Sequence, residues 1–65
     1  MKVTYDPEVD ALVVRLTDGQ ILESEQTQPG IIVDFDADGK IVALEFLHAT
    51  KQFSAKAISE FAKAA

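Results

Sequence analysis

Hydrophobic and polar residues alternate along most of the chain up to Leu47. Alternation with a period of two is typical of strands that bury one face. It predicts strands at about residues 2–6, 11–16, 20–27, 31–36 and 40–47. Turn-forming residues, including Pro7, Asp18-Gly19, Pro29-Gly30 and Asp38-Gly39, separate these runs. Taken in chain order, the strands are expected to form a five-stranded antiparallel β-meander.

The Asp38-Gly39 pair is the strongest turn signal, because Asp-Gly between two apolar runs is typical of a tight β-hairpin. A two-residue loop aligns three apolar pairs on one face, namely Phe35 with Val42, Val33 with Leu44, and Ile31 with Phe46. A slip of one residue would separate all three pairs, so the pattern specifies the register.

A second hairpin is predicted at Asp18-Gly19. A two-residue loop would place Glu23 and Glu25 on the apolar face, where unpaired carboxylates are costly. A three-residue loop that begins at Thr17 pairs Val14 with Leu22 instead and turns both glutamates outward. We therefore favour the longer loop.

The period changes after Thr50, where the chain is rich in Ala and Lys and its apolar residues recur at helical spacing. A helix is predicted at about residues 51–64, with Thr50 or Ser54 as its N-cap. Its apolar side consists of Phe53, Ala57, Ile58, Phe61 and Ala65. Since a helix of this length is marginal alone, we expect it to pack on the sheet. The predicted fold class is α+β, with residues 1–65 in one small domain.

The alternation gives the predicted sheet two different faces. The expected core face carries Val3, Tyr5, Leu12, Val14, Leu16, Leu22, Ile31, Val33, Phe35, Val42, Leu44 and Phe46, and the helix would cover it. The opposite face mixes aliphatic and charged side chains. Its candidate interface residues are Val13, Arg15, Ile21, Ile32, Ile41 and Ala43. Such a patch often marks an interaction surface, although scattered surface aliphatics are common. Because a lone small sheet leaves edges and one face uncovered, we expect self-association.

Composition narrows the function classes. Eleven acidic residues against six basic ones give a formal net charge of −5. Because an acidic protein repels phosphate backbones, direct nucleic-acid binding is not expected. The sequence contains no cysteine, which excludes disulfides and thiolate metal sites and favours a cytoplasmic location. No apolar run approaches the roughly 20 residues that cross a bilayer, so no membrane association is expected.

Residues 34–45 match the pattern of an EF-hand calcium loop, with acidic residues at Asp34, Asp36, Asp38 and Glu45. An EF-hand needs a helix on each side of its loop, whereas the flanking residues here alternate as strands do. In the predicted hairpin, Asp36 and Glu45 lie ~13 Å apart along the sheet, too far for one ion. No metal site is expected, and Asp36 and Asp38 are only weak cation candidates.

Signals of catalysis are sparse. The single histidine, His48, follows the last predicted strand, and no nucleophile motif accompanies it. The glycines are isolated turn residues and do not form a phosphate-binding loop. We therefore expect no enzyme activity, no catalytic residues and no cofactor.

Several motifs together resemble a small prokaryotic family, domain-of-unknown-function family 2283. They are Tyr-Asp-Pro-Glu at residues 5–8, Asp-Ala-Leu at residues 10–12, Pro-Gly at residues 29–30 and Asp-Gly at residues 38–39. Val13 and His48 depart from the family pattern, in which an aromatic residue and an aspartate are common. The resemblance implies no established activity. Some members resemble antitoxins in genetic setting, which implies a basic, toxin-like protein partner.

Two functions are compatible with these observations. The first is a small protein-interaction module that forms a homodimer or higher oligomer or binds a protein partner. The alternative is a protein that binds a small ligand or a weak cation at the Asp-rich turn, residues 34–38.

Overall fold

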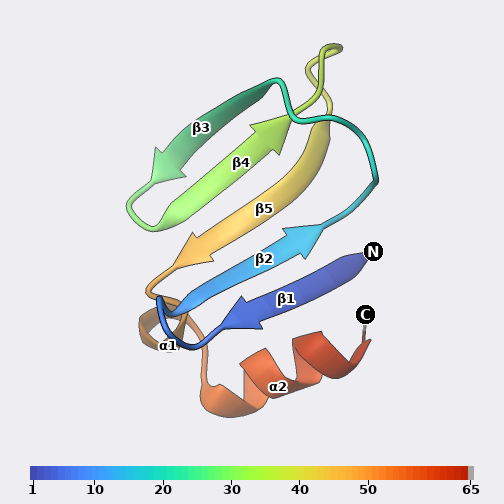
Figure 1. Ribbon diagram of the computed structural model, residues 1–65. Coiled ribbons are helices and arrows are strands. Elements are labelled where there is room, and N and C mark those ends of the chain that lie inside the picture. Colours follow the sequence, from blue (N-terminus) through green and yellow to red (C-terminus); the bar gives the residue numbers. More distant parts are fainter. Residues whose placement is uncertain (65) are drawn as a thin grey trace.

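The alternating runs form five strands in the computed structural model, which describes residues 1–64. The strands are β1 (Lys2–Asp6), β2 (Ala11–Arg15), β3 (Glu23–Gln28), β4 (Ile31–Phe35) and β5 (Ile41–Leu47). They are followed by helices α1 (Ala49–Gln52) and α2 (Ala55–Ala64) (Figure 1). The predicted α+β class, with a five-stranded antiparallel sheet and a C-terminal helix, is confirmed. Ala65, which was predicted on the apolar side of the helix, lies outside the described residues.

The strand order is β1-β2-β5-β4-β3, so the predicted meander is wrong in its connectivity. β2 pairs with β5 instead of β3, which sets Leu12 opposite Phe46 and Val14 opposite Leu44. β3 could not supply such partners, because its sequence Glu-Ser-Glu-Gln-Thr-Gln has no apolar residue. Apolar cross-strand pairing therefore favours β5 as the neighbour of β2.

The predicted Asp18-Gly19 hairpin does not form as a consequence. Residues 16–22 instead connect β2 to β3, which forms one edge of the sheet (Figure 1). This connection leaves Leu16 40% and Leu22 65% exposed, so the prediction that both belong to the core is wrong. The prediction that Glu23 and Glu25 turn away from the core face is also wrong, because they pair with Phe35 and Val33 on that face.

The β4–β5 hairpin keeps most of its predicted register. Val33 pairs with Leu44 and Ile31 with Phe46, as expected, but Phe35 pairs with Ile41 instead of Val42. The turn is one residue longer than predicted, since the Asp36 amide donates to the Lys40 carbonyl at 2.9 Å. A bulge at Val42 then adds one residue to β5 and restores the expected pairing beyond it.

The predicted C-terminal helix is divided in two at Phe53, whose backbone is extended (φ −130°, ψ 151°). This places the Phe53 ring edge-to-face against Phe46 at 5.1 Å and Phe61 at 5.9 Å between centroids. Ser54 then caps α2, since its hydroxyl oxygen accepts a hydrogen bond from the Ala57 amide at 3.0 Å.

The core lies between α2 and the β1–β2 side of the sheet. It consists of buried Leu12, Ala49 and Ile58, with Val3, Tyr5, Phe46 and Phe53 packed around them. Because Ile58 belongs to α2, the helix covers the face that carries Val3, Tyr5 and Leu12, as predicted. It contacts β1 most closely, at the lower edge of the sheet in Figure 1.

The short helix α1 ties two turns together at one end of the sheet (Figure 1). At the β1–β2 turn, the Asp10 carbonyl accepts a hydrogen bond from the Ala49 amide at 2.9 Å. At the β3–β4 turn, the Gln52 side-chain amide donates to the Gly30 carbonyl at 3.0 Å and to the Leu47 carbonyl at 2.7 Å. Gly30 has φ +83°, and a Cβ there would lie 2.9 Å from Gln52 Nε2. Glycine is therefore favoured at this position for two reasons: the backbone is left-handed, and a side chain would displace the Gln52 amide.

Replacing Gly30 with alanine should destabilise the protein more than the same change at Gly39. Gly39 has a similar φ of +77°, but in the described residues no atom lies within 4 Å of its would-be Cβ. Gly39→Ala should cost about 1–2 kcal/mol for the left-handed backbone alone. Gly30→Ala should cost about 1 kcal/mol more, because it also displaces the Gln52 amide. Chemical denaturation of both variants measures the difference, and equal losses would show that the Gln52 contact contributes nothing.

Candidate functional site: the helix-free face of the sheet

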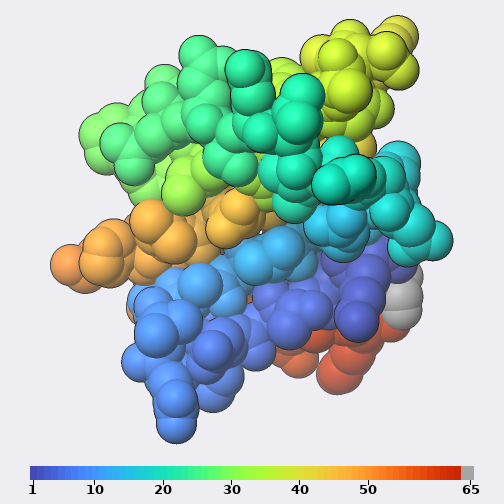
Figure 2. Space-filling view, turned by 45° about the horizontal axis from the view of Figure 1, so that its top comes forward, coloured from blue at the N-terminus to red at the C-terminus, as the bar shows by residue number. Residues whose placement is uncertain are grey.

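The face of the sheet turned away from α2 carries a mixture of aliphatic and charged side chains. The strand registers place two rows of residues on it, which run across the sheet from β1 to β3. We call this surface the helix-free face. Its first row is Lys2, Arg15, Ala43, Asp34 and Ser24, and its second row is Thr4, Val13, Glu45, Ile32 and Gln26. Figure 2 shows no helix in front of β1 and β2, and α2 is visible only below β1.

Four of the six predicted interface residues meet on this face. Val13, Arg15 and Ile32 are half-buried, and Ala43 on the central strand is only 1% exposed, so it forms the floor between its neighbours.

The other two predicted interface residues lie elsewhere. Ile41, which is 48% exposed, pairs with Phe35 on the opposite face, because the bulge at Val42 reverses the alternation. Ile21, which is 37% exposed, lies in the connection between β2 and β3.

Asp34 is the most unusual residue of the helix-free face. Its side chain is 1% exposed, although it carries a carboxyl group. The Ser24 hydroxyl donates a hydrogen bond to Asp34 Oδ1 at 2.5 Å. Asp34 Oδ2 is buried and receives no hydrogen bond from a donor in residues 1–64. A buried carboxylate oxygen without a donor is destabilising, so this group calls for a specific explanation.

Glu45 supplies part of that explanation. A side-chain interaction with Asp34 at hydrogen-bonding range is the main cause that raises the pKa of Glu45, followed by burial and by the negative charge of Asp34. Two carboxyl groups can form a hydrogen bond only when one of them holds a proton. A proton on Glu45 would therefore allow its carboxyl group to donate a hydrogen bond to Asp34.

The alternation of residues predicts Asp34 and Glu45 on the helix-free face, but the contact between them was not predicted. The predicted register already set Asp34 opposite Ala43, which makes Glu45 its diagonal neighbour on the adjacent strand. The alternation of the two strands is therefore sufficient to bring Asp34 and Glu45 together.

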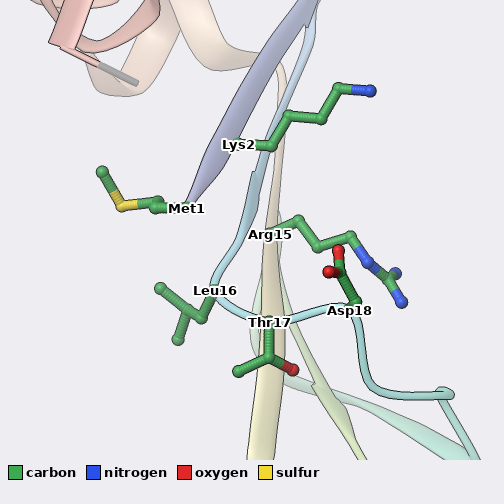
Figure 3. A pocket seen from close by; sticks show the side chains of 6 residues that line it. All are labelled: Met1, Lys2, Arg15, Leu16, Thr17 and Asp18. Atoms are coloured by element: carbon green, nitrogen blue, oxygen red, sulfur yellow. The ribbon is translucent and has the colours of Figure 1, made fainter.

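Basic side chains lie at the other end of the first row. Lys2 pairs with Arg15 across β1 and β2, and the Arg15 guanidinium donates a hydrogen bond to the Gly19 carbonyl. Both side chains line a shallow pocket of about 230 Å³ together with Met1, Leu16, Thr17 and Asp18. Figure 3 shows Lys2 and Arg15 pointing to one side of the strands, with the Asp18 carboxylate beside the guanidinium, and Met1 and Leu16 pointing to the other. The first row is thus basic at Lys2 and Arg15 and acidic at Asp34, while Asp6, which pairs with Ala11 on the same face, adds an acidic residue to β1.

The weak cation candidates serve the β4–β5 turn. Asp36 Oδ1 accepts hydrogen bonds from the Asp38 and Lys40 amides, both at 2.9 Å. This is the local capping that favours aspartate at turns. Within residues 1–64, no group of three or more His, Cys, Asp or Glu side chains is arranged to hold a metal ion.

A second polar cluster, at the β1–β2 turn, was not predicted from the sequence. Asp10 has a left-handed backbone (φ 55°) and accepts hydrogen bonds from the Tyr5 hydroxyl at 2.8 Å and the Thr50 hydroxyl at 2.6 Å. The bonds from Thr50 and then Tyr5 lower the pKa of Asp10, and the bond to Asp10 raises the pKa of Tyr5. Both shifts move the groups away from neutral pH, so the cluster is suited to anchoring α1 and poorly suited to proton transfer.

His48 follows the last strand, as predicted, and its side chain is exposed. Its backbone is left-handed (φ 51°) where the chain turns into α1, and its side chain forms no capping hydrogen bond there. Its positive charge contributes only the last of the causes that lower the pKa of Asp10.

A hollow of about 440 Å³ also lies between β1 and the helices. It is lined by Tyr5, Thr50, Ala55, Ile58, Ser59 and Ala62, none of which carries a charge at neutral pH. Its hydroxyl groups are those of Tyr5 and Thr50, which bind Asp10, and of Ser59, which is exposed on α2.

These features define a small α+β protein with an antiparallel sheet that α2 covers on one face, and with a charged, open second face. The chain belongs to the family described as protein of unknown function (DUF2283), which matches residues 2–49. The resemblance drawn from the sequence motifs is thereby confirmed. The matched stretch includes every residue of the helix-free face and ends at the start of α1.

No curated protein and no solved structure shows significant similarity to the chain. Neither helix in the described part of the chain is long and apolar enough to cross a membrane.

Replacing Asp10 with asparagine should lower stability in a pH-dependent way. Asparagine tolerates the left-handed backbone, so the change isolates the carboxylate. Because the folded pKa of Asp10 lies below its unfolded value, its contribution is present above about pH 4 and is lost as pH falls through the folded pKa. Thermal melting should therefore show a deficit for Asp10→Asn at pH 7 that shrinks below pH ~4. Asp38→Asn, at an exposed turn position, is the matched control, and a deficit independent of pH would contradict the assignment.

Proposed function

We propose that this protein is a small interaction module that self-associates, and that two copies meet through their helix-free faces. The observation that carries the proposal is the self-complementary order of residues around β5, the central strand. Arg15 and Asp34 flank Ala43 in the first row, and Val13 and Ile32 flank Glu45 in the second.

A two-fold axis parallel to β5 would exchange the two sides of the sheet. It would set Arg15 of one copy against Asp34 of the other, and Val13 against Ile32. Such an isologous contact uses the same patch twice and closes on itself as a dimer. Packed sheets are twisted, with strand directions within about 30° of each other, so facing residues of the two copies are closest near the axis. The small side chain of Ala43 permits close approach there.

The dimensions of the molecule agree with this arrangement. Its two longest extents are 34 and 25 Å, and the third is 16 Å. The broad side is therefore comparable in area to the ~800 Å² that each partner contributes to a stable interface of standard size. With α2 on one face of a small sheet, the second face is the large flat surface left for a partner.

A basic protein partner, as the antitoxin-like setting of some family members suggests, is the competing occupant of the same face. The acidic pair Asp34 and Glu45 would suit it, but Lys2 and Arg15 at the other end would repel it. A second copy sets Arg15 against Asp34 and Lys2 against the neutral Ser24, so the basic residues meet no like charge and we favour self-association.

Replacing Val13 with lysine should disrupt the dimer. The change places a charge in the apolar part of the contact, and we expect association to weaken at least tenfold, or about 1.4 kcal/mol. Val9→Lys is the matched control, because Val9 is 65% exposed in the β1–β2 turn, away from the helix-free face. Sedimentation equilibrium at micromolar concentrations measures both variants, and circular dichroism verifies that both are folded. A wild-type protein that remains monomeric, or equal weakening by both variants, would contradict the proposal.

A further inference from the structure

The Asp34–Glu45 pair is not explained by the core or by any turn of the fold. We propose that the pair is a receptor for a cationic side chain, that a shared proton occupies it in the free protein, and that the Arg15 guanidinium of a second copy occupies it in the dimer. This inference rests on the proposed self-association and identifies the contact that controls it.

The hydrogen-bonding state of Asp34 points to a cationic ligand. Ser24 satisfies Oδ1, whereas Oδ2 is buried without a donor from residues 1–64. A proton on Glu45 relieves the repulsion between the two carboxyl groups, but it supplies only one hydrogen bond. A guanidinium has five N–H donors in a planar fork that matches carboxylate geometry. It can therefore form an ion pair with Glu45, while its positive charge also compensates the negative charge of the buried Asp34 carboxylate.

Glu45 is the accessible member of the pair. Its side chain is partly exposed, whereas that of Asp34 is almost fully covered. An arriving cation would therefore meet Glu45 first, with the charge of Asp34 behind it. Since Glu45 lies on the central strand, Glu45 of one copy would face Glu45 of the other near the two-fold axis, and the two guanidinium groups have to compensate both charges.

Arg15 of the same copy does not fill this role. Its guanidinium donates to the Gly19 carbonyl, and β5 separates its strand from that of Asp34. Two strand spacings place the Arg15 and Asp34 backbones about 9–10 Å apart. In the two-fold arrangement, Arg15 of the second copy lies over Asp34 instead, because Arg15 and Asp34 are on opposite sides of Ala43 in the same row.

The other charged groups around the pair are few. On this face, β1 contributes Lys2 and, at its other end, Asp6, and β2 contributes Arg15, with Asp18 beside the guanidinium in the following loop. β3 contributes only the neutral Ser24 and Gln26, because Glu23 and Glu25 pair with Phe35 and Val33 on the opposite face. The titration of Glu45 therefore changes the charge at the centre of the helix-free face.

The exchange of proton for cation fixes the direction of the pH effect. When the guanidinium binds, Glu45 releases its proton to solvent and both carboxylates stay ionised. Because each receptor releases up to one proton, association should strengthen as pH rises through the pKa of Glu45 in the free protein. Added salt should weaken association, because the new contact is an ion pair.

Sedimentation equilibrium of the full chain between pH 4.5 and 8, at low and high salt, tests the inference. For the wild type, the association constant should rise by up to about tenfold per pH unit for each receptor. Glu45→Gln, which keeps a neutral hydrogen-bond donor beside Asp34, should remove this pH dependence. Arg15→Gln should weaken association at least tenfold at pH 7. Lys40→Gln, the same loss of charge at the exposed β4–β5 turn, should change it less than twofold.

The outcomes separate the receptor from the self-association on which it rests. A chain that is monomeric under all conditions would overturn both. If the protein dimerises but its association constant changes neither with pH nor on Arg15→Gln, the inference about the receptor is wrong and the self-association stands. The shared proton has its own test, because a carboxyl-carbon NMR titration should find Glu45 above its ordinary pKa of ~4.3 in the wild type. An ordinary value there would also overturn the receptor, even if the Glu45→Gln and Arg15→Gln variants failed to fold.

Discussion

The attachment of α1 to two separate turns is the constraint on which the rest of the structure depends. Through Asp10 it holds the β1–β2 hairpin, and through Gln52 and Gly30 it holds the β3–β4 turn, so that both lie beside the end of β5. The β2–β5 ladder joins the two halves of the sheet across the long connection of residues 16–22, and α1 adds a second link between them at one end. α1 also positions the following residues, Phe53 and α2, on the β1–β2 side of the sheet, where Leu12, Ala49 and Ile58 form the core.

This arrangement makes β5 the centre of the molecule in two senses. On the helix-covered face, Phe46 of β5 joins the core. On the helix-free face, Ala43 of the same strand lies between Arg15 and Asp34, and Glu45 lies between Val13 and Ile32. The helices α1 and α2, which cover the β1–β2 side of one face of the sheet, therefore determine which face is left for a partner. They also determine which charged residues that partner meets.

Much of the fold could be predicted from the alternation of side chains, but the strand order could not. The strands, the β4–β5 register near Val33 and the Ser54 cap all follow from local patterns. Local patterns say little about which distant strands pair. The Asp18-Gly19 dipeptide therefore predicted a β2–β3 hairpin, whereas in the structure β2 pairs with the apolar strand β5. Of the candidate site, Val13, Arg15, Ile32 and Ala43 were placed together correctly. Ile41 was not, because a single bulge residue reverses the face without leaving a clear mark in the sequence.

The central claim is that two copies meet face to face about β5, and intermolecular NOEs test it most directly. In a mixture of isotope-labelled and unlabelled chains, the Val13 methyl groups of one copy should show contacts to Ile32 of the other. Within one copy these residues lie on strands separated by β5, about 9–10 Å apart, so their contacts would report the second copy. The account predicts these NOEs at concentrations where the dimer is populated. Intermolecular contacts confined to the opposite face, such as those from Phe61, would contradict it.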